Sequence, residues 1–115
     1  MKNTFKTVAL IATVLMAFTA SANSADGKDR RIDLVNDTSV TMTEFYASNI
    51  DSDSWEEDIL DGDYLRPGKK FEINIDDGTG YCLFDLKAVF ADGDVVTEND
   101  FNVCVETRWR IYNSN

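Results

Sequence analysis

Histidine is absent from all 115 residues, and this absence excludes more chemistry than any other feature of the composition. Serine and cysteine nucleophiles usually pass their proton to histidine, and histidine is the commonest protein ligand of transition metals. Ser-Lys catalysis needs an activated lysine, but Lys69, Lys70 and Lys87 stand where we expect solvated charges. A carboxylate pair for glycoside hydrolysis is available among 21 acidic residues. A chain this short has little room for a substrate cleft as well as a core, so we expect no enzyme.

Long hydrophobic runs are also missing. The longest, Val8–Phe18, has about 11 residues, whereas a membrane-spanning helix needs about 20. Lys2 and Lys6 precede this run and the small residues 20–22 follow it, which is the three-part pattern of a cleaved secretory signal peptide. No cysteine for a lipid anchor stands at the cleavage site. We therefore predict a signal peptide over residues 1–22 and a periplasmic or secreted protein without a membrane anchor.

Basic residues are scarce relative to acidic ones. The chain has 11 Lys and Arg against 21 Asp and Glu, a formal net charge of −10. Because Lys2 and Lys6 lie in the predicted signal peptide, the remaining chain has nine basic residues against 21 acidic ones and a charge of −12. Nucleic acids and anionic membranes are bound chiefly through Lys and Arg, so neither is an expected partner. This charge favours a basic protein or a divalent cation, unless it serves only solubility.

Cysteine is limited to Cys82 and Cys104. Their spacing is not that of a CxxC redox motif, and without histidine they cannot complete a usual zinc site. In an oxidising compartment an even pair most simply forms a disulfide. Closing a loop of about 23 residues stabilises a fold by ~3 kcal/mol in the chain-entropy model. We therefore predict a disulfide between Cys82 and Cys104 that stabilises a small domain.

The residues after the signal peptide predict a single β-domain. Residues 23–29 have no apolar periodicity and are expected to be a flexible lead, while residues 30–115 form the domain. Period-2 alternation, strand-forming composition and intervening turn residues indicate about seven strands. The predicted strands are 31–34, 40–47, 69–75, 81–90, 95–97, 101–107 and 107–111. Short strands at such spacing are typical of an antiparallel β-sandwich, either immunoglobulin-like or Greek-key.

Alternation fails between residues 48 and 66, where acidic residues are dense. One tryptophan is followed at offsets of four and five by two aliphatic residues, which suits one or two helical turns with a single apolar side. Ser54 would cap this helix, with Glu57 as the capping-box partner. We predict a short helical turn over residues 55–60.

The same segment holds the best candidates for a cation site. Calcium prefers hard oxygen ligands, and seven carboxylates lie between positions 51 and 63. They are Asp51, Asp53, Glu56, Glu57, Asp58, Asp61 and Asp63. The segment fails as an EF-hand, because Glu56 stands where Gly is required and Gly62 where the bidentate Glu should be. A nonstandard calcium site and a solvated acidic loop are the two interpretations, and no other cofactor is expected.

Aromatic side chains are the second kind of candidate. Trp and Tyr stack on sugars and anchor protein interfaces. In a domain this small most aromatics should lie in the core, so we expect only one or two to be exposed. We select Trp55 in the acidic segment and Tyr64 just after it as partner-binding residues.

The order of motifs resembles that of a group of small exported bacterial proteins with no established activity. The motifs are Leu65-x-Pro67-Gly68, the segment Cys82–Lys87, Phe90-Ala91-Asp92-Gly93 and Asn102-Val103-Cys104, preceded by an acidic segment around Trp55. The resemblance implies a bacterial periplasmic or secreted β-domain with one disulfide. It adds no catalytic residue.

These features predict an exported, acidic, non-enzymatic binding module for a basic protein or for calcium. An inhibitor of lysozyme-type enzymes is one concrete form, although the chain has no inhibitor signature loop. One alternative is an envelope-assembly protein that works by strand addition at a free sheet edge, with Ile32–Val35 or Trp109–Tyr112 as that edge. The other alternative is a small carbohydrate-active enzyme.

Overall fold

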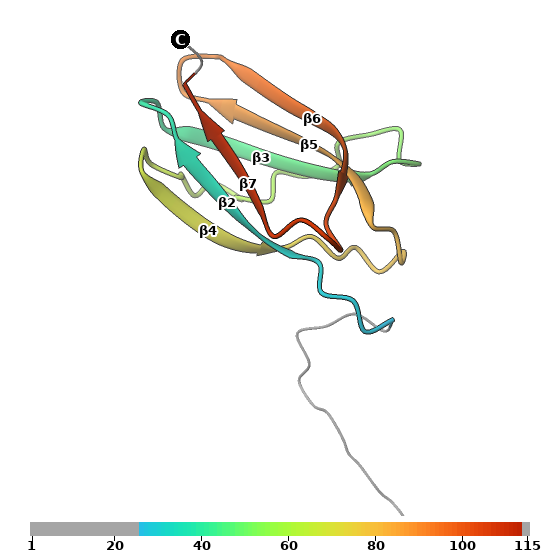
Figure 1. The fold of residues 1–115 in the computed structure, drawn as a ribbon. Coiled ribbons are helices and arrows are strands. Elements are labelled where there is room, and N and C mark those ends of the chain that lie inside the picture. Colours follow the sequence, from blue (N-terminus) through green and yellow to red (C-terminus); the bar gives the residue numbers. More distant parts are fainter. Residues whose placement is uncertain (1–25, 114–115) are drawn as a thin grey trace, which may run out of the picture.

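A computed structural model describes residues 26–113 of the chain, and this part forms six β-strands and no helix. The strands are β2 (Arg31–Asp37), β3 (Met42–Asn49), β4 (Lys69–Asn74), β5 (Leu83–Phe90), β6 (Val95–Asn102) and β7 (Arg108–Tyr112). They make two three-stranded sheets, one in the order β4-β2-β7 and the other in the order β3-β5-β6 (Figure 1). No helix among the described residues is long and apolar enough to cross a membrane. The predicted signal peptide at residues 1–22 lies outside the described residues.

Strand β2 is the centre of the first sheet. It pairs antiparallel with β4 and parallel with β7, so the sheet is mixed and not fully antiparallel as predicted. A parallel pair needs a long connection, and here the chain builds β3, β5 and β6 in the other sheet before β7 returns beside β2. The prediction of a free edge at Ile32–Val35 is wrong, because both sides of this strand are paired. Trp109–Tyr112 does lie in an edge strand.

Strand β5 is the centre of the second sheet, in which all pairs are antiparallel. Its residues Phe84, Leu86, Ala88 and Phe90 are buried, as the period-2 pattern of the sequence predicts. The intervening residues of β5 are only half-buried and face away from the core. This outer face carries the candidate site.

Buried side chains of both sheets belong to one hydrophobic core. Phe45 from β3 and Trp109 from β7 meet in this core, with their ring centroids 6.0 Å apart. Burying an aromatic side chain stabilises a fold by about 1.5–3 kcal/mol, so this pair is one of the main links between the sheets.

The disulfide between Cys82 and Cys104 is confirmed, with a Cα–Cα distance of 5.3 Å. Cys82 lies just before β5 and is half-buried, and Cys104 lies in the turn that follows β6. The bridge therefore fastens the start of β5 to the connection that leads to β7.

Strand β6 contains the predicted strand 95–97 but only the first two residues of the predicted strand 101–107, and residues 103–107 form the turn and connection to β7. The prediction of a separate strand at 101–107 is therefore wrong, and the described chain has six strands and not seven. The pairing register between β5 and β6 shifts by one residue near Phe84 and Leu86. At this β-bulge β6 has one residue more than β5, and Asp100 of β6 has a φ of 56°. The Asp100 N–H donates to the Asp85 carboxylate at 3.1 Å. This bulge lets the strand continue through a polar run that hides the alternation.

The predicted helical turn over residues 55–60 is wrong. Glu56 has a φ of 65°, which a right-handed helix excludes. The Ile59 N–H donates to the Phe45 carbonyl at 2.7 Å, and the Asp58 carboxylate accepts the Phe45 N–H at 2.9 Å. The polar groups that a helix would pair internally are thus bonded to the edge of β3.

Arg30 is a buried charge that ties the start of the domain to the loop before the disulfide. The residue is only 1% exposed. Its guanidinium donates to the carbonyls of Tyr81 at 2.6 Å and Gly80 at 2.9 Å. It also forms a bidentate ion pair with Asp26 at 3.0 and 2.8 Å. Asp26 belongs to the end of the lead predicted at residues 23–29, of which residues 23–25 lie outside the described part.

Candidate functional site

Charge is divided unevenly between the two sheets. The segments that build sheet β4-β2-β7, residues 26–37, 65–80 and 107–113, carry eight basic and seven acidic residues, a sum of +1. The segments that build sheet β3-β5-β6, residues 38–64 and 81–106, carry one basic and 14 acidic residues, a sum of −13. Nearly all of the net charge therefore belongs to one half of the domain.

The outer face of sheet β3-β5-β6 is defined by the pairing register, because residues directly opposite each other share a face. Tyr46, Lys87 and Thr97 form one row across the three strands, on the side away from the buried residues of β5. Glu44, Val89 and Val95 form the next row. Residues 51–58, with five carboxylates, lie beside this surface through the contact of Trp55 with Tyr46. We call the surface and residues 51–58 together the acidic face.

Lys87 is the single basic residue of this half, and it lies over two aromatic rings. Its Nζ is 4.6 Å from the ring centroid of Tyr46 and 5.0 Å from that of Trp55. The two rings are tilted to each other with centroids 6.5 Å apart. A cation over an aromatic face is attracted by about 0.5–1 kcal/mol at an exposed site. Lys87 is thus held in place, which differs from the freely solvated charge predicted for it.

A hydrogen bond fixes the Tyr46 ring from its other end. The Tyr46 hydroxyl donates to the Glu44 carboxylate at 2.5 Å. This bond, reinforced by burial and by the nearby negative charge, raises the pKa of Tyr46 to about 12. The phenol therefore stays protonated at every physiological pH. We call Tyr46, Trp55 and Lys87 the aromatic cluster.

The loop that carries Trp55 is held by serine hydroxyls. Ser48 from β3 and Ser52 both donate to the Ser54 carbonyl, at 2.7 and 3.0 Å. A small cavity of about 200 Å³ lies beside them, lined by Ser48, Ser52, Asp53, Ser54, Trp55 and Asp85. These bonds position Trp55 against the sheet.

The predicted calcium ligands are distributed along the loop at residues 51–63, which we call the acidic loop. Asp58 is engaged internally, since its carboxylate accepts the N–H groups of Phe45 and Leu60, each at 2.9 Å. Asp51 accepts the Tyr81 hydroxyl, and this bond raises the pKa of Tyr81. Asp53, Glu56, Glu57, Asp61 and Asp63 are exposed.

Among residues 26–113 no group of three or more Asp, Glu or Cys is close enough to hold a metal ion. A calcium site in the acidic loop therefore stays a prediction. The geometry assigns Asp58 a different role, the capping of the β3 edge.

The two predicted partner-binding residues lie in different surroundings. Trp55 is half-buried against Tyr46, whereas Tyr64 is 57% exposed. Tyr112, at the end of β7, is the other tyrosine of comparable exposure. The sequence pattern missed Tyr46, Glu44 and Lys87, which are recognisable only once β3 and β5 are paired in register.

Comparison with protein family models, curated proteins and solved structures finds no match to this chain. The charge and contacts of the molecule itself are therefore what supports a function.

Proposed function

We propose that this protein is an exported, non-enzymatic binding module that recognises a basic protein partner through its acidic face. The observation that carries the proposal is the division of charge, with 14 acidic residues and one basic residue in the half built on sheet β3-β5-β6. Export is supported by the signal-peptide pattern at residues 1–22 and by the disulfide. The absence of histidine supports a role without catalysis.

The two sheets of this module are proposed to form a β-sandwich of Greek-key or immunoglobulin-like type. The shared core and the Phe45–Trp109 contact between the sheets support this arrangement. In such a fold the outer face of each sheet is free for a partner.

Electrostatic complementarity would guide the partner to this face. Charges of one sign on one surface raise the association rate for an oppositely charged protein. Screening limits the attraction to about 8 Å at physiological ionic strength, so binding should weaken steeply as salt is added.

The aromatic cluster gives the acidic face an anchor. Interface energy is usually concentrated in a few Trp, Tyr and Arg side chains that are already held in place. Trp55 and Tyr46 meet this condition because the Ser54 carbonyl bonds, the Glu44 bond and Lys87 restrict them. A basic partner would place an apolar or cationic side chain against these rings.

Isothermal titration of a cationic probe, a lysozyme-type enzyme, at two salt concentrations tests the proposal. Asp53→Asn with Glu57→Gln removes two exposed charges from the loop that carries Trp55, and we expect binding at least about fivefold weaker. Asp29→Asn with Asp37→Asn is the matched control, because it removes the same charge from the other sheet. We expect the control to change binding less than twofold.

A second pair of variants separates the anchor from the charge. Trp55→Ala should weaken binding further, whereas Tyr112→Ala should not, although Arg110 lies over the Tyr112 ring at 4.7 Å much as Lys87 lies over Trp55. Equal losses for both charge pairs, or binding that does not depend on salt, would show that the acidic face is not the binding surface.

A further inference from the structure

Strand β4 has a free edge. The sheet order places it outside β2, and no strand among residues 26–113 pairs with its other side. The Ile75 N–H donates to the Arg30 carbonyl at 2.9 Å, which marks a hydrogen-bonded pair of the antiparallel ladder. Such pairs alternate along the ladder, so the backbone N–H and C=O groups of Lys70, Glu72 and Asn74 point away from β2.

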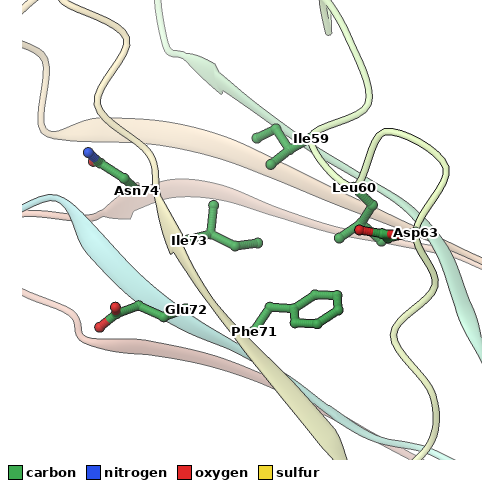
Figure 2. A pocket seen from close by; sticks show the side chains of 7 residues that line it. All are labelled: Ile59, Leu60, Asp63, Phe71, Glu72, Ile73 and Asn74. Atoms are coloured by element: carbon green, nitrogen blue, oxygen red, sulfur yellow. The ribbon is translucent and has the colours of Figure 1, made fainter.

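An apolar groove of about 370 Å³ lies beside this edge, between β4 and the end of the acidic loop. It is lined by Ile59, Leu60, Asp63, Phe71, Glu72, Ile73 and Asn74. Figure 2 shows Phe71 and Ile73 on the side that faces Ile59 and Leu60, with Glu72 and Asn74 directed the other way. Ile59 and Phe71 are each 37% exposed, although both are large and apolar.

The other sheet edges are protected. The acidic loop covers β3, because Ile59 bonds to Phe45, and Leu65 exchanges two backbone hydrogen bonds with Met42 at 2.9 and 3.0 Å. Strand β6 has the bulge at Asp100, and β7 has five residues with two arginines. Bulges, charges and short length are the usual means of blocking strand addition. Of the described edges, β4 alone combines open backbone groups with an apolar groove.

The charges around the groove favour a basic occupant. Asp63 and Glu72 line it, and Asp61 lies in the adjoining hollow, which shares Ile59 with the groove. Lys70 of β4 is paired with Asp33 at 3.5 Å. Two carboxylates, Asp63 and Glu72, therefore border the place of an added strand, and a third, Asp61, lies in the adjoining hollow.

We propose that β4 binds an extended segment of a partner protein as an added strand, with apolar side chains alternating with Lys or Arg. The apolar residues would point into the groove, and the alternate residues would lie on the outer side near Glu72. This proposal goes beyond the function proposed above, because it uses the edge of the other sheet. It makes β4, and not β7, the edge for strand addition.

The probe for the experiment is a ten-residue peptide of alternating valine and lysine, added to the domain from residue 23 onward. We expect amide resonances of β4 and of residues 59–63 to shift in NMR spectra, and hydrogen exchange at Glu72 and Asn74 to slow. The same peptide with a central proline should bind at least tenfold more weakly, because proline disrupts the added strand. A peptide of alternating valine and glutamate should also be at least tenfold weaker.

Variants of the protein locate the site. Glu72→Pro removes an outward N–H without removing a bond to β2, and we expect at least tenfold weaker binding. Thr97→Pro is the matched control, because the Phe90–Asp94 bond of 2.9 Å places the Thr97 N–H on the outward side of β6. Glu72→Gln isolates the effect of charge, and Ile59→Asp removes an apolar wall of the groove without changing the backbone of β4. Binding should survive Thr97→Pro and be at least tenfold weaker in Ile59→Asp.

Four results would overturn the proposal. They are the absence of shifts at millimolar peptide, shifts confined to β6 or the acidic face, equal binding by Glu72→Pro and Thr97→Pro, and a dimer of this chain in sedimentation experiments that Glu72→Pro abolishes. Glu72→Pro leaves all 14 acidic residues of the other half in place. Loss of peptide binding is therefore distinguishable from loss of binding to the cationic probe protein.

Discussion

Replacing Arg30 with methionine should destabilise the domain more than any other single change of a charged residue that we describe. Methionine fills a similar volume but donates no hydrogen bond. The carbonyls of Gly80 and Tyr81 would lose donors that lie at 2.9 and 2.6 Å. Each buried group left without a partner costs about 1–3 kcal/mol.

The ion pair with Asp26 adds less to this cost. The Asp26 side chain is 38% exposed, so water can solvate its carboxylate once the guanidinium is gone. We expect the free energy of unfolding to fall by about 3 kcal/mol. For a domain of this size each kcal/mol corresponds to about 4–8 °C, so Tm should fall by roughly 12–24 °C.

Urea and thermal unfolding followed by circular dichroism measure this effect, with the disulfide verified as intact in each sample. Arg31→Met is the control, because it removes an arginine from an ion pair with Asp29 in which the two side chains are 35% and 49% exposed, and its cost should stay below about 1 kcal/mol. A loss below about 1 kcal/mol for Arg30→Met would refute the reasoning. It would mean that the loop before Cys82 folds without the guanidinium.

Three further predictions concern the disulfide, the aromatic cluster and the acidic loop. Cys82→Ser should lower Tm by roughly 12–24 °C and reduction of the wild type should do the same, because closing the loop contributes ~3 kcal/mol; an unchanged Tm on reduction would contradict this. Ultraviolet titration should find one phenol with a pKa of about 12 that Tyr46→Phe removes. Because this pKa is raised in the folded state, the stabilisation from the Glu44 bond is complete below pH ~10 and disappears as the pH rises through about 12. Calcium bound in the acidic loop would raise the calorimetric unfolding midpoint of the wild type but not that of the double variant Asp53→Asn with Asp63→Asn. Equal unfolding midpoints of the wild type with calcium and with chelator would show that the loop binds no calcium.

The strands with one buried face could be predicted from the sequence. In β5 the alternation of Phe84, Leu86 and Ala88 with polar residues states directly which side chains are buried. The disulfide was predictable as well, because a chain with two cysteines has one possible internal pairing. These features depend on local period or on composition.

Features that depend on distant partners were not predictable. The apolar residues around Asp58 have helical spacing. However, the N–H of Phe45 in β3, 13 residues earlier, donates to the Asp58 carboxylate, and this contact favours a loop along β3 over a helix. Arg30 looks like a surface charge until Gly80 and Tyr81 are placed next to it. Strand β6 was divided in two because the bulge at Asp100 is set by Asp85, on the neighbouring strand.

The candidate site was predictable only in part. Trp55 was selected for its position among acidic residues, and it does lie on the acidic face. Its contact with Tyr46 and Lys87 follows from the pairing of β3 with β5, which has an irregularity between Met42 and Glu44. A shift of one residue would send Tyr46 to the opposite side of the sheet, and nothing in the local sequence fixes that choice.

The sums of +1 and −13 on the two halves also make the molecule a strong electric dipole. In the field of a cationic surface such a dipole experiences a torque before any contact forms. The protein therefore approaches with sheet β3-β5-β6 leading and β4-β2-β7 trailing, which removes much of the orientational search from an encounter. For the binding function proposed above, this gain would appear as speed of association, even where the final contact is weak.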